Sequence, residues 1–194
     1  LEAQRRGHRL LYLTQGDLQV RDGVALGRCA ELGVKDDAGG WYTLAAPAWQ
    51  PLARLDVVLA RKDPPFDSHF LHDTLVLELA ARDGALVVNA PQALRDANEK
   101  LYAQAFPQCC PPVLVSADRK RLRAFHKQHQ DVIFKPLDGM GGTGIFRVRQ
   151  DDPNVSVILE MLTGHGRQTI MAQRFIPEIA AGDKRILVIN GEPV

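Results

Sequence analysis

The chain has 194 residues, of which 45% are hydrophobic and 24% are charged, and its formal net charge is +1 at pH 7. This is an ordinary globular composition, with enough apolar residues for one sizeable core or two small ones. A charge balance this even gives no electrostatic reason to expect nucleic acid or an anionic membrane as a partner. No apolar run approaches the roughly 20 residues that span a bilayer.

The cysteines predict the redox compartment, and the chain ends predict a longer protein. Three cysteines, two of them adjacent at Cys109 and Cys110, make a poor disulfide framework and indicate a reducing, cytoplasmic compartment. The chain opens on LEAQRRG, which predicts the last turns of a helix ended by Gly7. It closes inside a hairpin turning at Asn190 and Gly191. We therefore expect a piece of a longer protein.

The first predicted elements are short strands. RLLYL (residues 9–13) alternates as a strand, and DLQVRDGVAL (residues 17–26) predicts a hairpin that turns at Asp22 and Gly23. Residues 41–49 have weak periodicity, and no element is predicted there.

A βαβ unit follows. DVVLAR (residues 56–61) and ALVVN (residues 85–89) are continuous apolar runs, typical of buried parallel strands. Between them, after the proline-containing loop RKDPPFD, a helix is expected over residues 68–81, with Asp67 as its N-cap. The apolar stripe of this helix is predicted at Leu71, Leu75 and Leu79. Strand, helix and strand together predict an α/β fold with a parallel sheet in the first half of the chain.

The second half predicts an α+β unit rich in antiparallel hairpins. A proline-rich connection over residues 106–112 is suited to a domain boundary. The elements expected after it are strand 113–115, helix 118–129, strand 132–135, strand 145–149, helix 154–162, strand 169–175 and strand 185–189.

The stretch VIFKPLDGMGGTGIFRV (residues 132–148) reads as strand, glycine-rich turn and strand. Its four glycines exceed what turning alone requires. It is not a P-loop, because the lysine precedes the glycines and a strand follows, and GMGGTG lacks the βαβ context of a dinucleotide fingerprint. The N–H groups of such a loop can cover phosphates. The alternative is a mobile surface hairpin.

Two lysines favour the phosphate interpretation. Lys135 ends an apolar strand, where a lysine either reaches solvent or binds an anion. Lys100, in RDANEKL, is expected on a helical segment at the entry to the same domain, with a solvated helix face as the alternative. Two ammonium groups and a glycine flap together predict a cradle for a triphosphate.

Two further segments could contact a nucleotide. AQRFIP (residues 172–177) is a strand end whose backbone could read an adenine edge, with an ordinary edge strand as the alternative. In GDKR, Asp183 could accept from ribose hydroxyls and Arg185 could hold an anionic substrate group. Either could equally be a turn residue and a surface charge.

Two other patterns favour solvated surfaces. His69 and His72 share one helix face, and His126 and His129 share another, but no third metal ligand is placed and solvated side chains are expected. The basic helix over residues 118–127 has an apolar stripe, so a solvated face is expected in place of a nucleic-acid patch.

Five stretches, in this order and at this spacing, resemble the prokaryotic glutathione synthetase family of the ATP-grasp superfamily: DVVLARKDPPFD, VVNAPQALRDANEKL, KPLDGMGGTGIF, MAQRFIP and GDKRILVINGEPV. The similarity runs across all 194 residues. It implies an α/β ATP-grasp fold in three parts. These are an N-terminal substrate domain over residues 1–97, a small lid domain over residues 98–176, and the start of a larger lobe over residues 177–194.

The resemblance also assigns roles to individual residues. The phosphate-binding lysines match Lys100 and Lys135, and Asp183 matches an acid that contacts ribose. Arg61 matches an arginine near the dipeptide substrate, and Arg185 matches a catalytic arginine near the reacting groups. The phosphate-covering loop matches Gly139, Met140, Gly141 and Gly142, and the adenine-contacting hinge matches Gln173, Arg174, Phe175 and Ile176.

The activity implied by the resemblance is ATP-dependent ligation of γ-glutamylcysteine to glycine, with Mg²⁺ as cofactor and Mn²⁺ as a substitute. The metal ligands are expected beyond Val194, so no residue is assigned to the metal. The resemblance also implies a homo-oligomer. Another ATP-grasp carboxylate–amine ligase and a non-catalytic ATP-binding module remain as alternatives.

Overall fold

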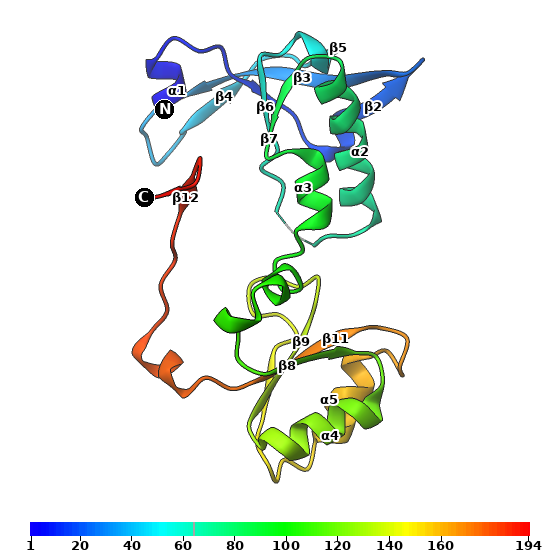
Figure 1. Ribbon diagram of the computed structural model, residues 1–194. Helices are drawn as coiled ribbons and strands as arrows, with labels where there is room; N and C mark the ends of the chain where they lie inside the picture. Colours follow the sequence, from blue (N-terminus) through cyan, green and yellow to red (C-terminus); the bar gives the residue numbers. More distant parts are fainter. Residues whose placement is uncertain (64) are drawn as a thin grey trace. The chain divides into compact units, whose positions relative to one another are not determined.

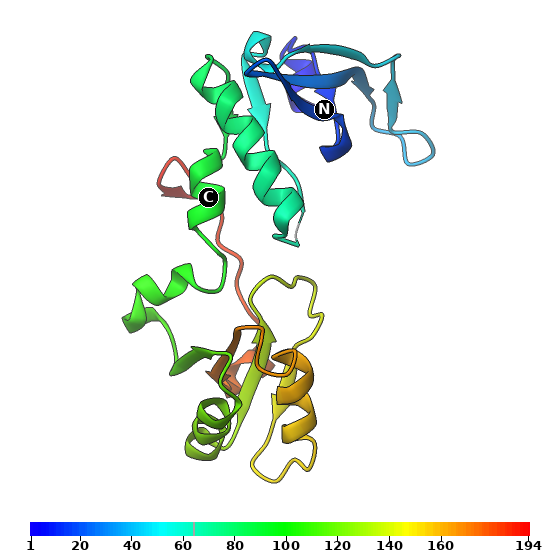
Figure 2. The same ribbon diagram turned by 90° about the vertical axis from the view of Figure 1, so that its right-hand side faces the viewer.

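The computed structural model describes residues 1–63 and 65–194. The chain divides into two compact units, Leu1–Asn98 and Glu99–Val194, whose elements are labelled in Figure 1 and seen from a second side in Figure 2. Each unit has its own buried apolar cluster. Pro64, one of the two prolines of the RKDPPFD loop, lies outside the described residues.

The N-terminal unit combines a five-stranded antiparallel sheet with a two-stranded parallel sheet. Its helices and strands are α1 (Glu2–Arg5), β1 (Leu11–Tyr12), the 3₁₀ helix η1 (Gln15–Asp17), β2 (Leu18–Arg21), β3 (Val24–Val34), β4 (Tyr42–Leu44), β5 (Ala48–Pro51), η2 (Leu52–Arg54), β6 (Val57–Leu59), α2 (Ser68–Arg82), β7 (Leu86–Val88) and α3 (Pro91–Asp96).

Local turn chemistry accounts for the first elements as predicted. α1 is terminated by the following Gly7, whose φ of +81° suits glycine, and His8 N–H donates to Ala3 O at 3.1 Å. The β2–β3 hairpin turns at Asp22 and Gly23, with φ values of 51° and 80°. Positive φ at both central residues is the type I′ geometry that matches the twist of the two strands.

Strands β4 and β5 were not predicted. Both pair with β3, an 11-residue strand that also pairs with β1 and β2. Their conformation therefore depends on a partner strand distant in sequence, which local periodicity does not reveal.

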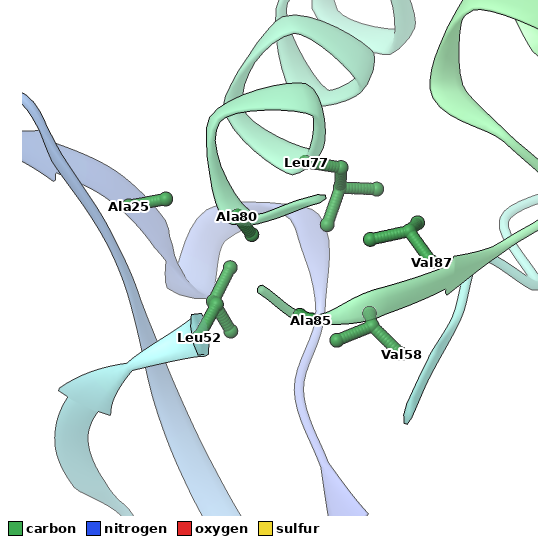
Figure 3. Close-up of a cluster of buried hydrophobic side chains, with 7 residues drawn as sticks. All are labelled: Ala25, Leu52, Val58, Leu77, Ala80, Ala85 and Val87. Carbon is green, nitrogen blue, oxygen red and sulfur yellow. The ribbon is translucent and has the colours of Figure 1, made fainter. Parts of the chain in front are cut away.

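The predicted βαβ unit is confirmed: β6 pairs with β7 in parallel, and α2 connects them. Asp67 caps α2, because its carboxylate accepts from Phe70 N–H at 2.8 Å. Figure 3 shows the core between α2 and the strands, where Leu77 of the helix faces Val87 and Ala80 faces Leu52.

Two details of this unit correct the sequence prediction. Val57 and Leu59 are 48% and 63% exposed, so β6 is buried on one face and not on both. On α2, Leu75 is 45% exposed, while the buried positions are Thr74, Leu77 and Ala80. Leu77 and Ala80 pack into the apolar cluster with the strands, and Thr74 Oγ1 accepts from Arg95 of α3 at 3.3 Å.

The C-terminal unit is built on one four-stranded antiparallel sheet in the order β10–β9–β11–β8. Its helices and strands are η3 (Tyr102–Ala105), η4 (Pro107–Cys109), β8 (Val113–Ser116), α4 (Arg119–His129), β9 (Val132–Pro136), β10 (Phe146–Val148), α5 (Val155–Leu162), β11 (Ile170–Arg174), η5 (Pro177–Ala181), β12 (Val188–Ile189) and β13 (Glu192–Pro193). The expected antiparallel pairing is confirmed.

The last predicted strand is shorter than expected. Residues 185–189 were expected to form it, but β12 covers Val188–Ile189 and pairs with β13 across the predicted Asn190–Gly191 turn. The central residues have φ values of 52° and 86°, again the type I′ geometry. Among the described residues, no helix has the length and apolar character needed to span a bilayer.

Candidate nucleotide site

Strand alternation separates the two faces of the C-terminal sheet. Val132, Phe134, Ile170 and Ala172 point to one face and pack against α4 and α5 in a cluster that is almost fully buried. Both helices lie on the same side of the sheet in Figure 1. The intervening residues point to the opposite face, and Ile133, Lys135 and Gln173 there stay half-buried. The chemistry-bearing side chains of the sheet therefore lie on the face away from the helices.

Lys135 is held on this face by a neutral acceptor. Its Nζ donates to Gln173 Oε1 at 2.6 Å. The two residues lie diagonally across β9 and β11, since Lys135 is opposite Met171 and Gln173 is opposite Ile133. Burial lowers the pKa of Lys135, and the charge of Lys100 lowers it further. A half-buried cation next to a second cation favours an anionic ligand.

Lys100 reaches the start of the glycine loop. Its Nζ donates to Leu137 O at 3.2 Å and to Gly139 O at 2.7 Å, and it forms an ion pair with Glu99. The side chain is 11% exposed. Lys100 lies in a turn between α3 and η3, so the expectation of a helical segment is wrong. Lys100 is far from the glycine loop in the sequence, but it contacts the loop in space, and Lys135 directly precedes the same loop.

The shape of the loop favours glycine at each of its four glycine positions. Gly141, Gly142 and Gly144 have φ values of 63°, 79° and 71°, which residues with a Cβ rarely adopt. A Cβ at Gly139 would lie 3.1 Å from Pro136 Cγ and 3.3 Å from Thr143 O. The shape of the loop therefore accounts for all four glycines, and their number alone is no evidence for a ligand. Figure 2 shows this loop extending beyond the ends of β9 and β10.

The predicted hinge begins where β11 ends. Arg174 N–H donates to Pro112 O at 3.0 Å, on the side of β8, and Phe175 N–H donates to Asp131 O at 2.9 Å, on the side of β9. Backbone groups of successive extended residues point to opposite sides. The C=O of Arg174 and the N–H of Ile176 consequently point together toward the segment that leads into β8.

Sequence reasoning missed two residues beside the hinge. Arg147 forms a two-point ion pair with Asp131, at 2.9 Å and 2.7 Å, and its guanidinium lies 3.5 Å from the centroid of the Phe175 ring. The ion pair lowers the pKa of Asp131. The alternation of FRV, in which Phe146 is opposite Phe134 and Arg147 is opposite Ile133, places Arg147 on the same face as Lys135. That pattern was the available signal.

Three predicted site residues lie apart from this cluster in the chain. Asp183 and Arg185 are exposed and lie in the segment between η5 and β12 that belongs to neither helix nor strand. Arg61 follows β6 in the N-terminal unit, and its N–H donates to Leu59 O at 3.0 Å.

The described residues 1–63 and 65–194 contain no group of three histidine, cysteine or acidic side chains that could hold a metal ion. His69 and His72 are exposed, as expected. His126 is 5% exposed and its Nε2 lies 3.0 Å from Arg149 O, so the expectation of a solvated side chain is wrong there. The hydrogen bond to a backbone carbonyl satisfies this buried ring.

Comparison with solved structures identifies the fold. The D-alanyl-alanine synthetase A of Vibrio cholerae aligns with a TM-score of 0.52 at 12% identity, over 91% of this chain and 54% of that chain. A D-cycloserine synthetase aligns with a TM-score of 0.51 at 16% identity, over 67% of this chain and 47% of that chain. At these identities the likeness shows the fold alone.

Sequence comparison is more specific. The glutathione synthetase of Pseudomonas aeruginosa is 59% identical over 194 residues, which are 100% of this chain and 61% of that protein. The glutathione synthetase of Shewanella oneidensis is 54% identical over the same 194 residues and is covered to 62%. The chain thus spans less than two thirds of the length of these relatives.

Two domain families account for almost the whole chain. Residues 1–95 match the N-terminal domain of prokaryotic glutathione synthetase, and residues 99–194 match the ATP-grasp domain of the same enzyme. The order of the two domains and the sequence identity to the relatives indicate the same family, and the fold is consistent with it. The chain belongs to the prokaryotic glutathione synthetase family, and its fold is the α/β ATP-grasp fold.

Proposed function

We propose that the full-length protein is an ATP-dependent ligase that joins γ-glutamylcysteine to glycine and releases glutathione, ADP and phosphate. The observation that carries this proposal is the convergence of Lys100, Lys135 and the glycine loop in one unit of a chain that belongs to this family. In such a reaction the cysteinyl carboxylate takes the γ-phosphoryl group of ATP. The glycine amine then displaces phosphate from the acyl phosphate.

Residues on the face of the sheet away from the helices would hold the triphosphate. Lys135 and Lys100 supply two positive charges, and the loop supplies N–H groups from Gly139, Met140, Gly141 and Gly142. In the structure Lys100 already donates to two loop carbonyls. A phosphate would compete with these carbonyls for the same ammonium group, so that nucleotide binding and loop position become linked.

The hinge would hold the base. Arg174 C=O and Ile176 N–H are an acceptor and a donor on one side of the strand, which suits the donor and acceptor edge of adenine. Gln173 and Phe175 complete the hinge, with Gln173 holding Lys135. Asp183 would contact ribose, and Arg185 would lie near the reacting carboxylate. Arg61 of the N-terminal unit would contact the dipeptide.

A divalent metal belongs to this proposal, with Mg²⁺ as the ion and Mn²⁺ as a substitute. It would neutralise charge on the transferring phosphoryl group. The described residues contain no group of three histidine, cysteine or acidic side chains for it. This chain would bind and orient the nucleotide. We further propose residues 177–194 as the start of a third domain, a homo-oligomeric assembly, and the cytoplasm as the compartment.

The test is ADP release by the full-length protein with Mg-ATP, γ-glutamylcysteine and glycine, omitting each component in turn. Release that requires all of them, with glutathione as product, supports the proposal. Release only with a different acid and amine would keep an ATP-grasp ligase and reject the substrates. ATP binding without ADP release for any acceptor pair would leave a non-catalytic binding module.

A further inference from the structure

Three segments of the C-terminal unit meet at the end of the sheet where β11 stops. Arg147 comes from the edge strand β10, Asp131 immediately precedes β9, and Phe175 immediately follows β11. Because β9 lies between β10 and β11 in the sheet, the Arg147 side chain crosses the start of β9 to reach Phe175.

Asp131 connects the three segments through two different groups. Its carboxylate accepts both hydrogen bonds from the Arg147 guanidinium, at 2.9 Å and 2.7 Å, and its carbonyl accepts the Phe175 N–H at 2.9 Å. The two-point ion pair fixes the plane of the guanidinium, because a planar fork meets a planar carboxylate in one orientation. The guanidinium therefore has a defined position when it contacts the ring.

The Phe175 ring and backbone are fixed by the same pair of residues. The Arg147 Cζ lies 3.5 Å from the ring centroid, which is a close cation–π contact. The ring is thus held from one side while the amide of Phe175 is held by Asp131. The side chains of Arg147 and Asp131 are 38% and 35% exposed, so these contacts order the face of the sheet opposite the buried Val132 and Val148.

We infer that Arg147 is a positioning residue for nucleotide recognition, which holds the end of β11 through Phe175 so that Arg174 C=O and Ile176 N–H keep their orientation. This inference rests on the proposed function, since it assigns the base to the hinge. The proposed phosphate site is at Lys100, Lys135 and the glycine loop, so Arg147 would contact neither the phosphates nor the reacting groups. Its loss should therefore weaken binding of the base and leave the chemical step unchanged.

The chemical step should be unaffected because the proposed phosphate site and the Arg147 contacts lie at opposite ends of β9. Lys135 lies near the far end of β9, whereas Arg147 is opposite Ile133 and Asp131 precedes the strand. Contacts to the base are the same in the ground state and the transition state, so losing them raises the KM for ATP without lowering kcat. A loosened hinge should also discriminate less between ATP and GTP, whose base edges differ in donor and acceptor order.

The experiment compares Arg147→Ala, Arg147→Lys and wild type in the full-length protein, measuring kcat, the KM for each substrate, and the melting temperature. Arg147→Ala is expected to raise the KM for ATP about 10-fold, from the loss of the cation–π contact and the hinge order it maintains. The kcat and the KM values for the other two substrates should stay within about twofold. Arg147→Lys keeps the cation and should restore part of the loss.

The matched control is Arg119→Ala. Arg119 forms an ion pair with Glu160 at 3.2 Å, at similar exposure and between α4 and α5 of the same unit. It should change neither the KM for ATP nor the ratio of kcat/KM for ATP over GTP. An unchanged KM for ATP in Arg147→Ala would overturn the inference. So would a fall of every parameter together with the melting temperature, because that marks a merely structural role.

A wild-type protein that binds ATP but releases no ADP would reject the proposed ligase, yet the inference would still be tested by the dissociation constant for ATP. A larger dissociation constant for ATP in Arg147→Ala than in Arg119→Ala would then support the inference, and equal constants would overturn the inference. A wild-type protein that binds no ATP at all would overturn both.

Discussion

Lys135 Nζ on β9 donates a hydrogen bond to Gln173 Oε1 on β11 at 2.6 Å, so the half-buried ammonium is held by a neutral amide. A neutral acceptor orients the lysine without cancelling its charge. The charge stays available to an incoming anion, whereas a carboxylate at the same position would compete with it.

Replacing Lys135 by alanine should lower the kcat/KM for ATP by about 100-fold or more, the scale seen when one preorganised charge stabiliser is removed. ADP release by the full-length protein measures this. Lys127→Ala, an exposed lysine in the last turn of α4, is the control and should behave as wild type. Near-wild-type turnover in Lys135→Ala would refute the role of Lys135.

The same lysine should lower the stability of the nucleotide-free protein. Burial and the charge of Lys100 hold the pKa of Lys135 below its ordinary value of 10.5, so folding disfavours the charged form. Lys135→Met should therefore raise the free energy of unfolding at pH 7. As pH rises through the lowered pKa toward 10.5, wild type gains stability relative to the variant and the difference narrows. Urea unfolding at several pH values between neutrality and pH 10 checks the sign, and a difference that widens would contradict it.

Lys100 should restrain the glycine loop before nucleotide binds. Its Nζ donates to Leu137 O and Gly139 O, so Lys100→Met should speed hydrogen exchange at the loop amides of residues 139–144. The change should be confined to that loop, because the helices α4 and α5 pack on the other face of the sheet. Equal exchange in both proteins would show that the contact does not order the loop.

Glycine substitutions separate loop strain from ligand contact. Gly142 has a φ of 79° and Gly166 a φ of 90°, and a Cβ at either has no neighbour closer than 3.8 Å. Alanine at each position should cost about 1 kcal/mol of backbone strain and lower the melting temperature by similar amounts. Gly142→Ala should also raise the KM for ATP several-fold. If Gly166→Ala raised the KM as much, the effect would be general destabilisation.

Asp17 should make the N-terminal unit sensitive to acid. Its carboxylate accepts from Thr14 Oγ1 at 2.7 Å, from Thr14 N–H at 2.9 Å and from Arg28 at 2.8 Å. These bonds to Thr14, and then Arg28, lower the pKa of Asp17 to about 2. The stabilisation is present above the ordinary pKa of 3.8 and is lost as pH falls through about 2.

Asp17→Asn should thus lower the free energy of unfolding at pH 7 by about 1 kcal/mol, the scale of a lost helix cap. The difference from wild type should disappear near pH 2. Both tryptophans of the chain, Trp41 and Trp49, lie in this unit, so their fluorescence during urea unfolding reports on it. A difference that is independent of pH would reject the titration of Asp17 as its cause.

Some parts of the candidate site followed from local chemistry and others did not. Lys135 and the glycine loop are contiguous in the chain, and their strand–turn–strand pattern marks them without a structure. Three other residues come from segments that lie 16 to 44 residues apart in the chain: Asp131, Arg147 and Phe175. Only pairing of β9 with both β10 and β11 brings them together.

The amino-acid sequence by itself determined the caps, the type I′ turns and the order of the other main helices and strands, because these depend on neighbours within a few residues. It also determined the family, through stretches spread along the whole chain. The tertiary structure decided which face of α2 is buried, that residues 42–44 and 48–51 form strands on β3, and that Arg147 contacts Phe175. These features depend on partners distant in the chain, and side-chain periodicity carries no record of which partner a strand or a helix face will meet.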